Sequence, residues 1–387
     1  MHFFLHSVNM ANILVGLIIC LMAVQTIQAD GNRTRTPNST QPEVCPKSFK
    51  GKIYQRNLTK QQLAGVHPSG DPWLDVDPDD AATAYATGLL STWILPIAYI
   101  LAMIVGIPSN AYILAFLRLR LQAKSLSTVV LYLNLALSDL LLLLSLALRI
   151  HYHFSGNNWV FGEISCRLMT ALFYGNVYCS AQTIACISLK RYLAVVKPFL
   201  YRRLAKTALA IWASLIVWFL FGAAIVPELL VRQSYWLAEL GVTTCHDVLP
   251  LEEKPHSLLV PYRLMLVCLG FIVPFLISIY AHVSVVHHLG QSGCNWRPFI
   301  KISTLVFIIF VVCFLPSGIL HIAHYARLLS SGDDKLYGYY RCAVCLCCFH
   351  SCLDPFLCLL ISKSAASEIQ FISIRRIPER LAVKICD

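Results

Sequence analysis

Two carboxylates and one amide interrupt long apolar runs of this sequence, and they are the residue types that could do chemistry there. Asp139 and Asp354 are the carboxylates, and Asn110 is the amide. An ionisable group at bilayer depth costs about 3 kcal/mol or more, so such residues are candidates for function. Together the three could form an interior polar cluster that holds a sodium ion or water. The alternative is that each one only bonds a neighbouring helix.

A second kind of chemistry is offered by the Lys47–Ser48 peptide bond, in a polar segment near the amino terminus. Trypsin-like serine proteases bind Lys or Arg in an acidic pocket, and a flexible chain is open to their attack. Pro46 also suits thrombin, whose neighbouring pocket accepts proline. Cleavage would create a new ammonium group on a peptide that begins Ser48, Phe49, Lys50, Gly51, Lys52, Ile53.

Seven apolar segments must position these residues. Hydrophobic residues make up 57% of the 387-residue chain and charged residues 13%, which is too little charge to cover a water-soluble surface. A helix of about 20 apolar residues spans the bilayer core, where only helices satisfy such a backbone. The predicted fold class is therefore an all-α membrane protein, a seven-transmembrane helix bundle with a disordered extracellular amino-terminal tail. The predicted spans are 91–117, 127–151, 163–189, 208–231, 262–287, 299–325 and 337–361.

The loops indicate the orientation of these spans. Basic residues follow the first, third, fifth and seventh spans, whereas the other loops are mixed or acidic. This places the amino terminus outside and the carboxyl terminus in the cytoplasm. Residues 1–29 have the pattern of a secretory signal peptide. N-glycosylation sequons follow at Asn32, Asn38 and Asn57, which also favours an extracellular tail and a plasma-membrane location.

Several other classes of protein are disfavoured. The net charge of +11 gathers on one set of loops, which is typical of membrane topology and not of nucleic-acid binding. The sequence has no HExxH or GxSxG motif and no inverted repeat, which argues against an enzyme or a transporter. Most of the sixteen cysteines lie in apolar runs and are expected to pack there. No CxxC pair has a partner pair at zinc spacing, so we expect no metal site. Cys45 has no predicted partner.

The segment pattern resembles rhodopsin-like receptors along the whole region of the spans. The residues that carry the resemblance are Asn110, Leu135-Ala136, Asp139, Cys166, Arg191-Tyr192, Trp218, Pro274, Cys313-Phe314-Leu315-Pro316 and Asp354-Pro355. Three further segments resemble the protease-activated receptors among them: Thr243–Pro250 with its His-Asp pair, Gly156–Glu163, and Phe173–Cys179.

This resemblance implies a disulfide between Cys166 and Cys245 and a tethered ligand, residues 48–53, that is unmasked by cleavage after Lys47. His246 and Asp247 are then expected at the ligand site, together with tyrosines that line the outer mouth, namely Tyr174, Tyr325, Tyr337 and Tyr340. The alternative for these tyrosines is a belt of residues at the lipid headgroups. The implied partners are a trypsin-like serine protease of thrombin or trypsin type, a heterotrimeric G protein, the lipid bilayer and a second receptor in a dimer.

The expected division of the chain is a signal peptide over 1–29, a cleaved propeptide over 30–47, a tail with the tethered ligand over 48–90, the bundle over 91–361 and a short cytoplasmic tail over 362–387. Arg191 and Tyr192 are the expected G-protein contacts. Two departures bear on signalling: Lys190 stands where such receptors carry an acid, and Cys358 stands where Tyr is usual. These departures favour one rival, a non-signalling protease cofactor. A peptide receptor that needs no proteolysis is a second, separate alternative.

Overall fold

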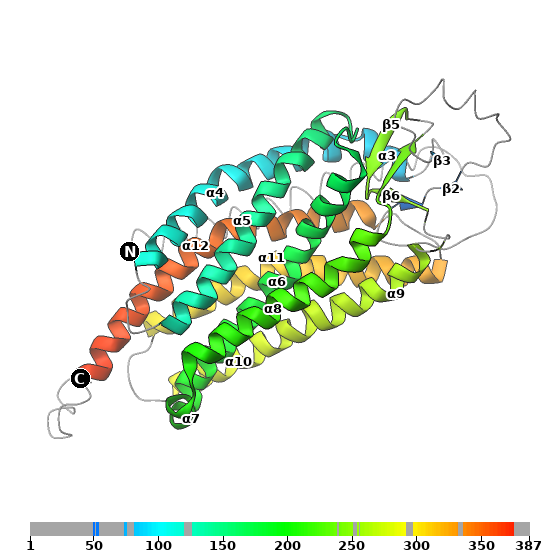
Figure 1. Ribbon diagram of the computed structural model, residues 1–387. Coiled ribbons are helices and arrows are strands. Elements are labelled where there is room, and N and C mark those ends of the chain that lie inside the picture. Colours follow the sequence, from blue (N-terminus) through cyan, green and yellow to red (C-terminus); the bar gives the residue numbers. More distant parts are fainter. Residues whose placement is uncertain are drawn as a thin grey trace.

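Seven long helical segments run side by side in the computed structural model (Figure 1). The structure describes residues 49–50, 52–53, 73–75, 81–119, 126–237, 240–250, 254, 256–291, 297–331 and 336–374. The seven segments are η1 (Leu90–Ile94) with α4 (Leu95–Leu119), α5 (Leu126–Phe154), α6 (Gly162–Val196), α8 (Lys206–Leu230), α9 (His256–Val267) with η2 (Cys268–Ile272) and α10 (Val273–Gly290), α11 (Arg297–Ser331), and α12 (Tyr337–Ile374). The predicted seven-helix bundle is confirmed.

Five of these segments are long and apolar enough to cross a membrane by themselves. The other two, α6 and α12, are less apolar because they supply much of the buried polar interior, including Asn176 and Thr183 on α6 and His350 and Asp354 on α12. Helix α6 packs against α5, α8 and α10. Close approach of α6 to α8 depends on Gly175, where an added Cβ would lie 2.3 Å from the Phe221 ring.

Short strands cover one end of the bundle, which we call the strand end. Strands β4 (Ser234–Leu237) and β5 (Val242–Cys245) are an antiparallel pair, and β6 (Val248–Leu249) follows them. Helix α7 (Pro198–Arg203) lies at the opposite end, which we call the α7 end (Figure 1).

Parts of the amino-terminal tail pair with these strands and form two small sheets. Strand β1 (Phe49–Lys50) pairs in parallel with β6, and β2 (Lys52–Ile53) pairs with β3 (Trp73–Asp75), which pairs in turn with β4. Helix α3 (Ala81–Thr87) leads into the first span. These short strands and this helix are ordered elements within the tail that was predicted to be disordered. Apolar periodicity could not reveal β1 and β3, because their backbone groups pair with the distant strands β6 and β4.

Candidate functional site

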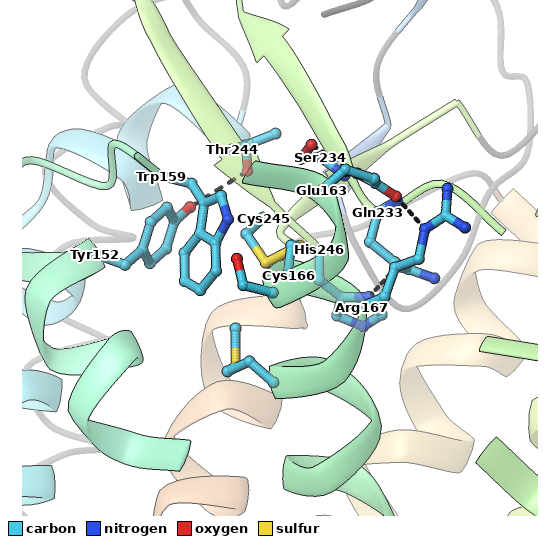
Figure 2. Close-up of a disulfide and its surroundings, with 12 residues drawn as sticks. Tyr152, Trp159, Glu163, Cys166, Arg167, Gln233, Ser234, Thr244, Cys245 and His246 are labelled. Carbon is cyan, nitrogen blue, oxygen red and sulfur yellow. Dashed lines mark hydrogen bonds and ion pairs between the residues drawn. A yellow bond between two sulfur atoms is a disulfide. The ribbon is translucent and has the colours of Figure 1, made fainter. Parts of the chain in front are cut away.

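A disulfide fixes the loop that carries β4, β5 and β6. The predicted bond between Cys166 and Cys245 is present, with the two Cα atoms 5.8 Å apart, and it ties the end of β5 to the first turns of α6 (Figure 2). Glu163 adds a second anchor: its carboxylate accepts the backbone N–H groups of Gln233 and Ser234, each at 2.8 Å. The start and the end of the β4–β5 pair are thus held to the same helix.

His246 has an uncommon backbone conformation directly after the disulfide. Its φ is 68°, in the left-handed region that costs a side-chain-bearing residue free energy. Gln233 stabilises it twice, since the His246 backbone N–H donates to the Gln233 carbonyl at 2.9 Å and the His246 ring nitrogen Nδ1 lies 2.7 Å from Gln233 Oε1. The imidazole also packs on the ring of Tyr174, with centroids 5.1 Å apart. His246 therefore has a structural role at the predicted site.

Asp247 lies at the centre of the strand end but is enclosed. Its two carboxylate oxygens accept the hydroxyls of Tyr152 and Tyr337 at 2.9 and 2.8 Å, and the Arg341 guanidinium lies 3.6 Å away. Burial raises the pKa of the Asp247 carboxyl, while the charge of Arg149 and the two hydroxyls act in the opposite direction. A ligand that binds Asp247 would therefore have to compete with these three partners.

The four predicted tyrosines lie inside the bundle. Tyr325, Tyr337 and Tyr340 are at most 2% exposed. The Tyr174 hydroxyl accepts a hydrogen bond from Arg341 at 3.1 Å. The ring centroids of Tyr340 and Tyr325 lie 4.8 and 5.0 Å from that of His321. Such burial disagrees with the alternative of a lipid-facing belt. Tyr174 and Tyr340 also line a small cavity between the helices, whereas Tyr337 is used by Asp247.

Three buried arginines at this end were not predicted. Arg263 forms a two-point ion pair with Glu228, with N–O distances of 2.5 and 2.6 Å. Arg149 lies over the Phe173 ring at 4.5 Å, and Arg341 contacts Asp247. All three side chains are fully buried. Ionisable groups within membrane spans are candidates for function whatever the sign of their charge, so the sequence already contained a signal for these three bases.

The polar cluster predicted from Asn110, Asp139 and Asp354 lies deeper between the two ends. Asn110 donates to the Ser351 carbonyl at 2.8 Å, and the Ser351 hydroxyl donates to Asp139 at 2.9 Å. Asp139 and Asp354 lie close enough to interact, and His350 Nδ1 is 3.1 Å from an Asp354 oxygen. The structure thus brings the three residues together through α12.

The α7 end contains the residues expected to contact a G protein. Arg191 donates to the Tyr132 hydroxyl at 3.1 Å, Lys190 donates to the Thr128 hydroxyl, and Tyr192 lies 5.7 Å from the Tyr280 ring. A cavity lined by Arg191 and Tyr132 reaches inward to His350 and Asp354. Cys358 lies in α12.

Some predicted features lie outside the described residues: the cleavage pair Lys47–Ser48, the ligand residue Gly51, the three sequons and Cys45. The side chains of the ligand residues in β1 and β2 are not described either, so only their backbone pairing bears on the site.

Comparison with known proteins agrees with this geometry. A family model described as 7 transmembrane receptor (rhodopsin family) matches residues 109–357. The chain is 41% identical to proteinase-activated receptor 3 of Homo sapiens over 285 residues, 74% of this chain and 76% of that one. It is 32% identical to proteinase-activated receptor 2 of Rattus norvegicus over 355 residues, 90% and 87% of the two chains. It is 35% identical to proteinase-activated receptor 4 of Homo sapiens over 299 residues, 77% of each. The chain therefore belongs to the proteinase-activated receptors, within the rhodopsin-like family of G-protein-coupled receptors.

Proposed function

We propose that a trypsin-like serine protease of thrombin or trypsin type cleaves this receptor after Lys47 and that residues 48–53 then act as its tethered ligand. In this proposal the strand end faces the outside of the plasma membrane and the α7 end faces the cytoplasm, where it engages a heterotrimeric G protein. The basic loops after the odd-numbered spans support this orientation, as does a disulfide at the strand end, since such bonds persist in oxidising compartments.

The observation that carries the proposal is the register between β1 and β6. Phe49 pairs with Val248 and Lys50 with Leu249, in parallel. In the sequence, Ser48 directly precedes Phe49 and Asp247 directly precedes Val248. Continuing the register would therefore bring the ammonium group of a newly formed Ser48 terminus to the acidic residue of the loop.

In the uncleaved chain, Phe49 and Lys50 of this segment already pair with the loop. Cleavage would therefore change the charge of the Ser48 nitrogen more than the distance between the segment and the loop. Before cleavage the Ser48 nitrogen is a neutral amide; afterwards it is an ammonium group. We propose that this ammonium competes with Arg341 for Asp247. Arg341 is 3.6 Å from Asp247 and also donates to Tyr174, so its release would alter contacts of both α12 and α6. A charge-assisted hydrogen bond is strong enough to compete with so long an ion pair.

The tether makes weak binding sufficient. The chain between Ser48 and the first span is about 40 residues long, and an extended chain of that length reaches over 100 Å at about 3.3 Å per residue. Such a flexible tether gives an effective ligand concentration on the order of millimolar. Activation would be irreversible, because the ligand remains covalently attached.

The test is calcium release in cells that express the full chain or Lys47→Ala. We expect the protease to activate the unchanged receptor, with the response lost in Lys47→Ala and kept in the matched control Lys60→Ala. The free peptide Ser-Phe-Lys-Gly-Lys-Ile should activate all three. A Lys47→Ala receptor that still answers the same protease would instead favour a cleavage elsewhere or a receptor that needs no proteolysis.

A peptide acetylated at its amino terminus tests the role of the ammonium. Loss of one charged hydrogen bond costs about 1.5–3 kcal/mol, so potency should fall roughly 10- to 100-fold. Equal potency of the acetylated and free peptides would contradict the pairing with Asp247.

The rival of a non-signalling cofactor receptor rests on Lys190 and Cys358. Arg191 lacks the adjacent acid of other receptors, but it is restrained by the Tyr132 hydroxyl instead. This contact supports a coupling-competent receptor. If the protease causes calcium release that a G-protein inhibitor abolishes, the cofactor rival is wrong. If cells that display the receptor release no calcium, the rival is supported.

We also propose that the polar cluster holds a sodium ion. Among the residues that the structure describes, Asp139 Oδ2 and Asn110 Oδ1 are buried oxygens without a hydrogen-bond partner, and hard cations prefer oxygen ligands. A bound sodium ion would supply positive charge between Asp139 and Asp354. We expect sodium, compared with potassium at equal ionic strength, to raise the thermal stability of the purified receptor, and Asp139→Asn to abolish the difference.

A further inference from the structure

A groove opens at the α7 end between α6, α7 and α8. Its wall is apolar and includes Leu189 and Leu193 of α6 and Leu209 and Ala213 of α8. Lys190 and Lys206 also line it. Leu189 and Leu209 are 44% and 52% exposed, so in a membrane this wall would meet lipid acyl chains.

The two lysines have only uncharged partners among the described residues. Lys190 donates to the Thr128 hydroxyl, and the Lys206 ammonium lies 4.6 Å from the centre of the Tyr201 ring. None of the described residues that line the groove is acidic. From residue 190 to residue 206 the sequence contains six Lys or Arg and no Asp or Glu. The groove therefore has uncompensated positive charge directly beside an apolar wall.

We propose that this groove binds one anionic phospholipid, with the phosphate headgroup between Lys190 and Lys206 and an acyl chain along the leucines. Charge complementarity selects the headgroup, since basic residues at a membrane surface attract anionic lipids. The apolar wall selects a lipid over a soluble phosphate. Lys190, which departs from the acid usual in rhodopsin-like receptors, gains a role in this site. The leaflet is the cytoplasmic one under the orientation proposed above, but the binding itself depends on neither proteolysis nor the tethered ligand.

The experiment measures lipids retained by the purified full-length receptor, by native mass spectrometry. Phosphatidylserine and phosphatidylcholine with the same acyl chains are offered together. We expect the receptor to keep phosphatidylserine preferentially and the double variant Lys190→Gln/Lys206→Gln to keep roughly tenfold less of it. The charge-matched control is Lys197→Gln/Arg202→Gln, which removes two exposed bases that do not line the groove; it should lose about twofold or less, as expected for screened surface charge.

Three further arms separate the parts of the proposal. Lys190→Arg/Lys206→Arg keeps both charges and should retain the lipid. This result would show that substitution at these two positions does not by itself abolish lipid binding. Ala213→Phe should reduce retention by filling the acyl-chain path while both lysines remain. Glycerophosphoserine, the headgroup without acyl chains, should not displace the lipid.

The proposal is overturned if both lipids are retained equally, if the control variant loses as much as the groove variant, or if a neutral sterol probe occupies the groove and phosphatidylserine does not. Displacement by glycerophosphoserine would show a phosphate site and not a lipid site. These results do not depend on whether the receptor is cleaved, so they would leave the proposed function standing.

Discussion

The strand end and the α7 end of the bundle satisfy their charges in different ways. At the strand end, Asp247 has two tyrosine hydroxyls and an arginine around it, and Glu228 holds Arg263 at two points. At the α7 end, the hydrogen-bond partners of Lys190 and Arg191 within the described part of the chain are hydroxyl groups. A closed, paired network suits a platform on which a ligand must find fixed partners. Loosely held bases suit a surface that moves and changes partners.

The largest expected effect would come from opening the strand end at its disulfide. Replacing Cys245 with Ser removes a crosslink between residues 79 apart. The chain-entropy model gives about 4 kcal/mol of destabilisation for such a loop, and the helices should remain inserted. We expect a marked fall in the thermal midpoint in detergent and loss of the response to free peptide. Cys268→Ser, at an exposed unpaired cysteine, should change neither; a peptide response that survives Cys245→Ser would show that the loop needs no anchor.

The second-largest effect is expected at the buried Arg263–Glu228 ion pair. Glu228→Gln leaves a fully buried guanidinium uncompensated, which costs about 3–5 kcal/mol. The double variant Glu228→Leu/Arg263→Met removes both charges and should recover most of the thermal stability. If the double variant is as unstable as the single one, the pair does not act through charge.

An intermediate effect is expected at Asp247. Asp247→Asn keeps the shape but loses the charge, so the potency of the free peptide should fall roughly tenfold. Tyr337→Phe removes one hydrogen bond to the carboxylate and should cost less, about 1 kcal/mol of stability. The acetylated peptide should lose nothing further on Asp247→Asn, because both changes remove the same interaction. Additive losses would assign the ammonium to another acid.

The smallest effect is expected at the α7 end. Lys190→Asp would place an acid beside Arg191, and a partly exposed pair of this kind is worth about 0.5–1 kcal/mol. We expect basal signalling to fall two- to fivefold, measured as inositol phosphate in cells with equal surface expression. Lys197→Asp, a nearby charge change that does not adjoin Arg191, should leave it unchanged. Higher basal signalling in Lys190→Asp would mean that Lys190 itself stabilises the inactive arrangement.

The fold was predictable because each membrane helix is encoded within its own segment and the orientation follows from the summed charge of the loops. An apolar run of about 20 residues determines a membrane helix without reference to any other segment, and the bias of basic loops supports one orientation of seven such runs. The cluster of Asn110, Asp139 and Asp354 was predictable for a related reason, since polar groups within apolar helices must face one another.

The arrangement of the strand end was decided only by the tertiary structure. Nothing local in Phe49–Lys50 indicates that these residues pair with Val248–Leu249, because the pairing partners lie almost 200 residues apart. The enclosure of Asp247 likewise depends on Tyr152, Tyr337 and Arg341, which come from two different helices.

The sequence by itself determined the seven helices, the polar cluster and the family, because each rests on residue type and spacing along one segment. Only the tertiary structure decided that the loop acid Asp247 already has partners and that Phe49–Lys50, in the segment proposed as ligand, pair with the strand that follows this acid. The physical reason is that the interaction energy of a charged group in a protein depends on its partners and on how much water surrounds it. Both are determined by packing between segments that are far apart in the chain.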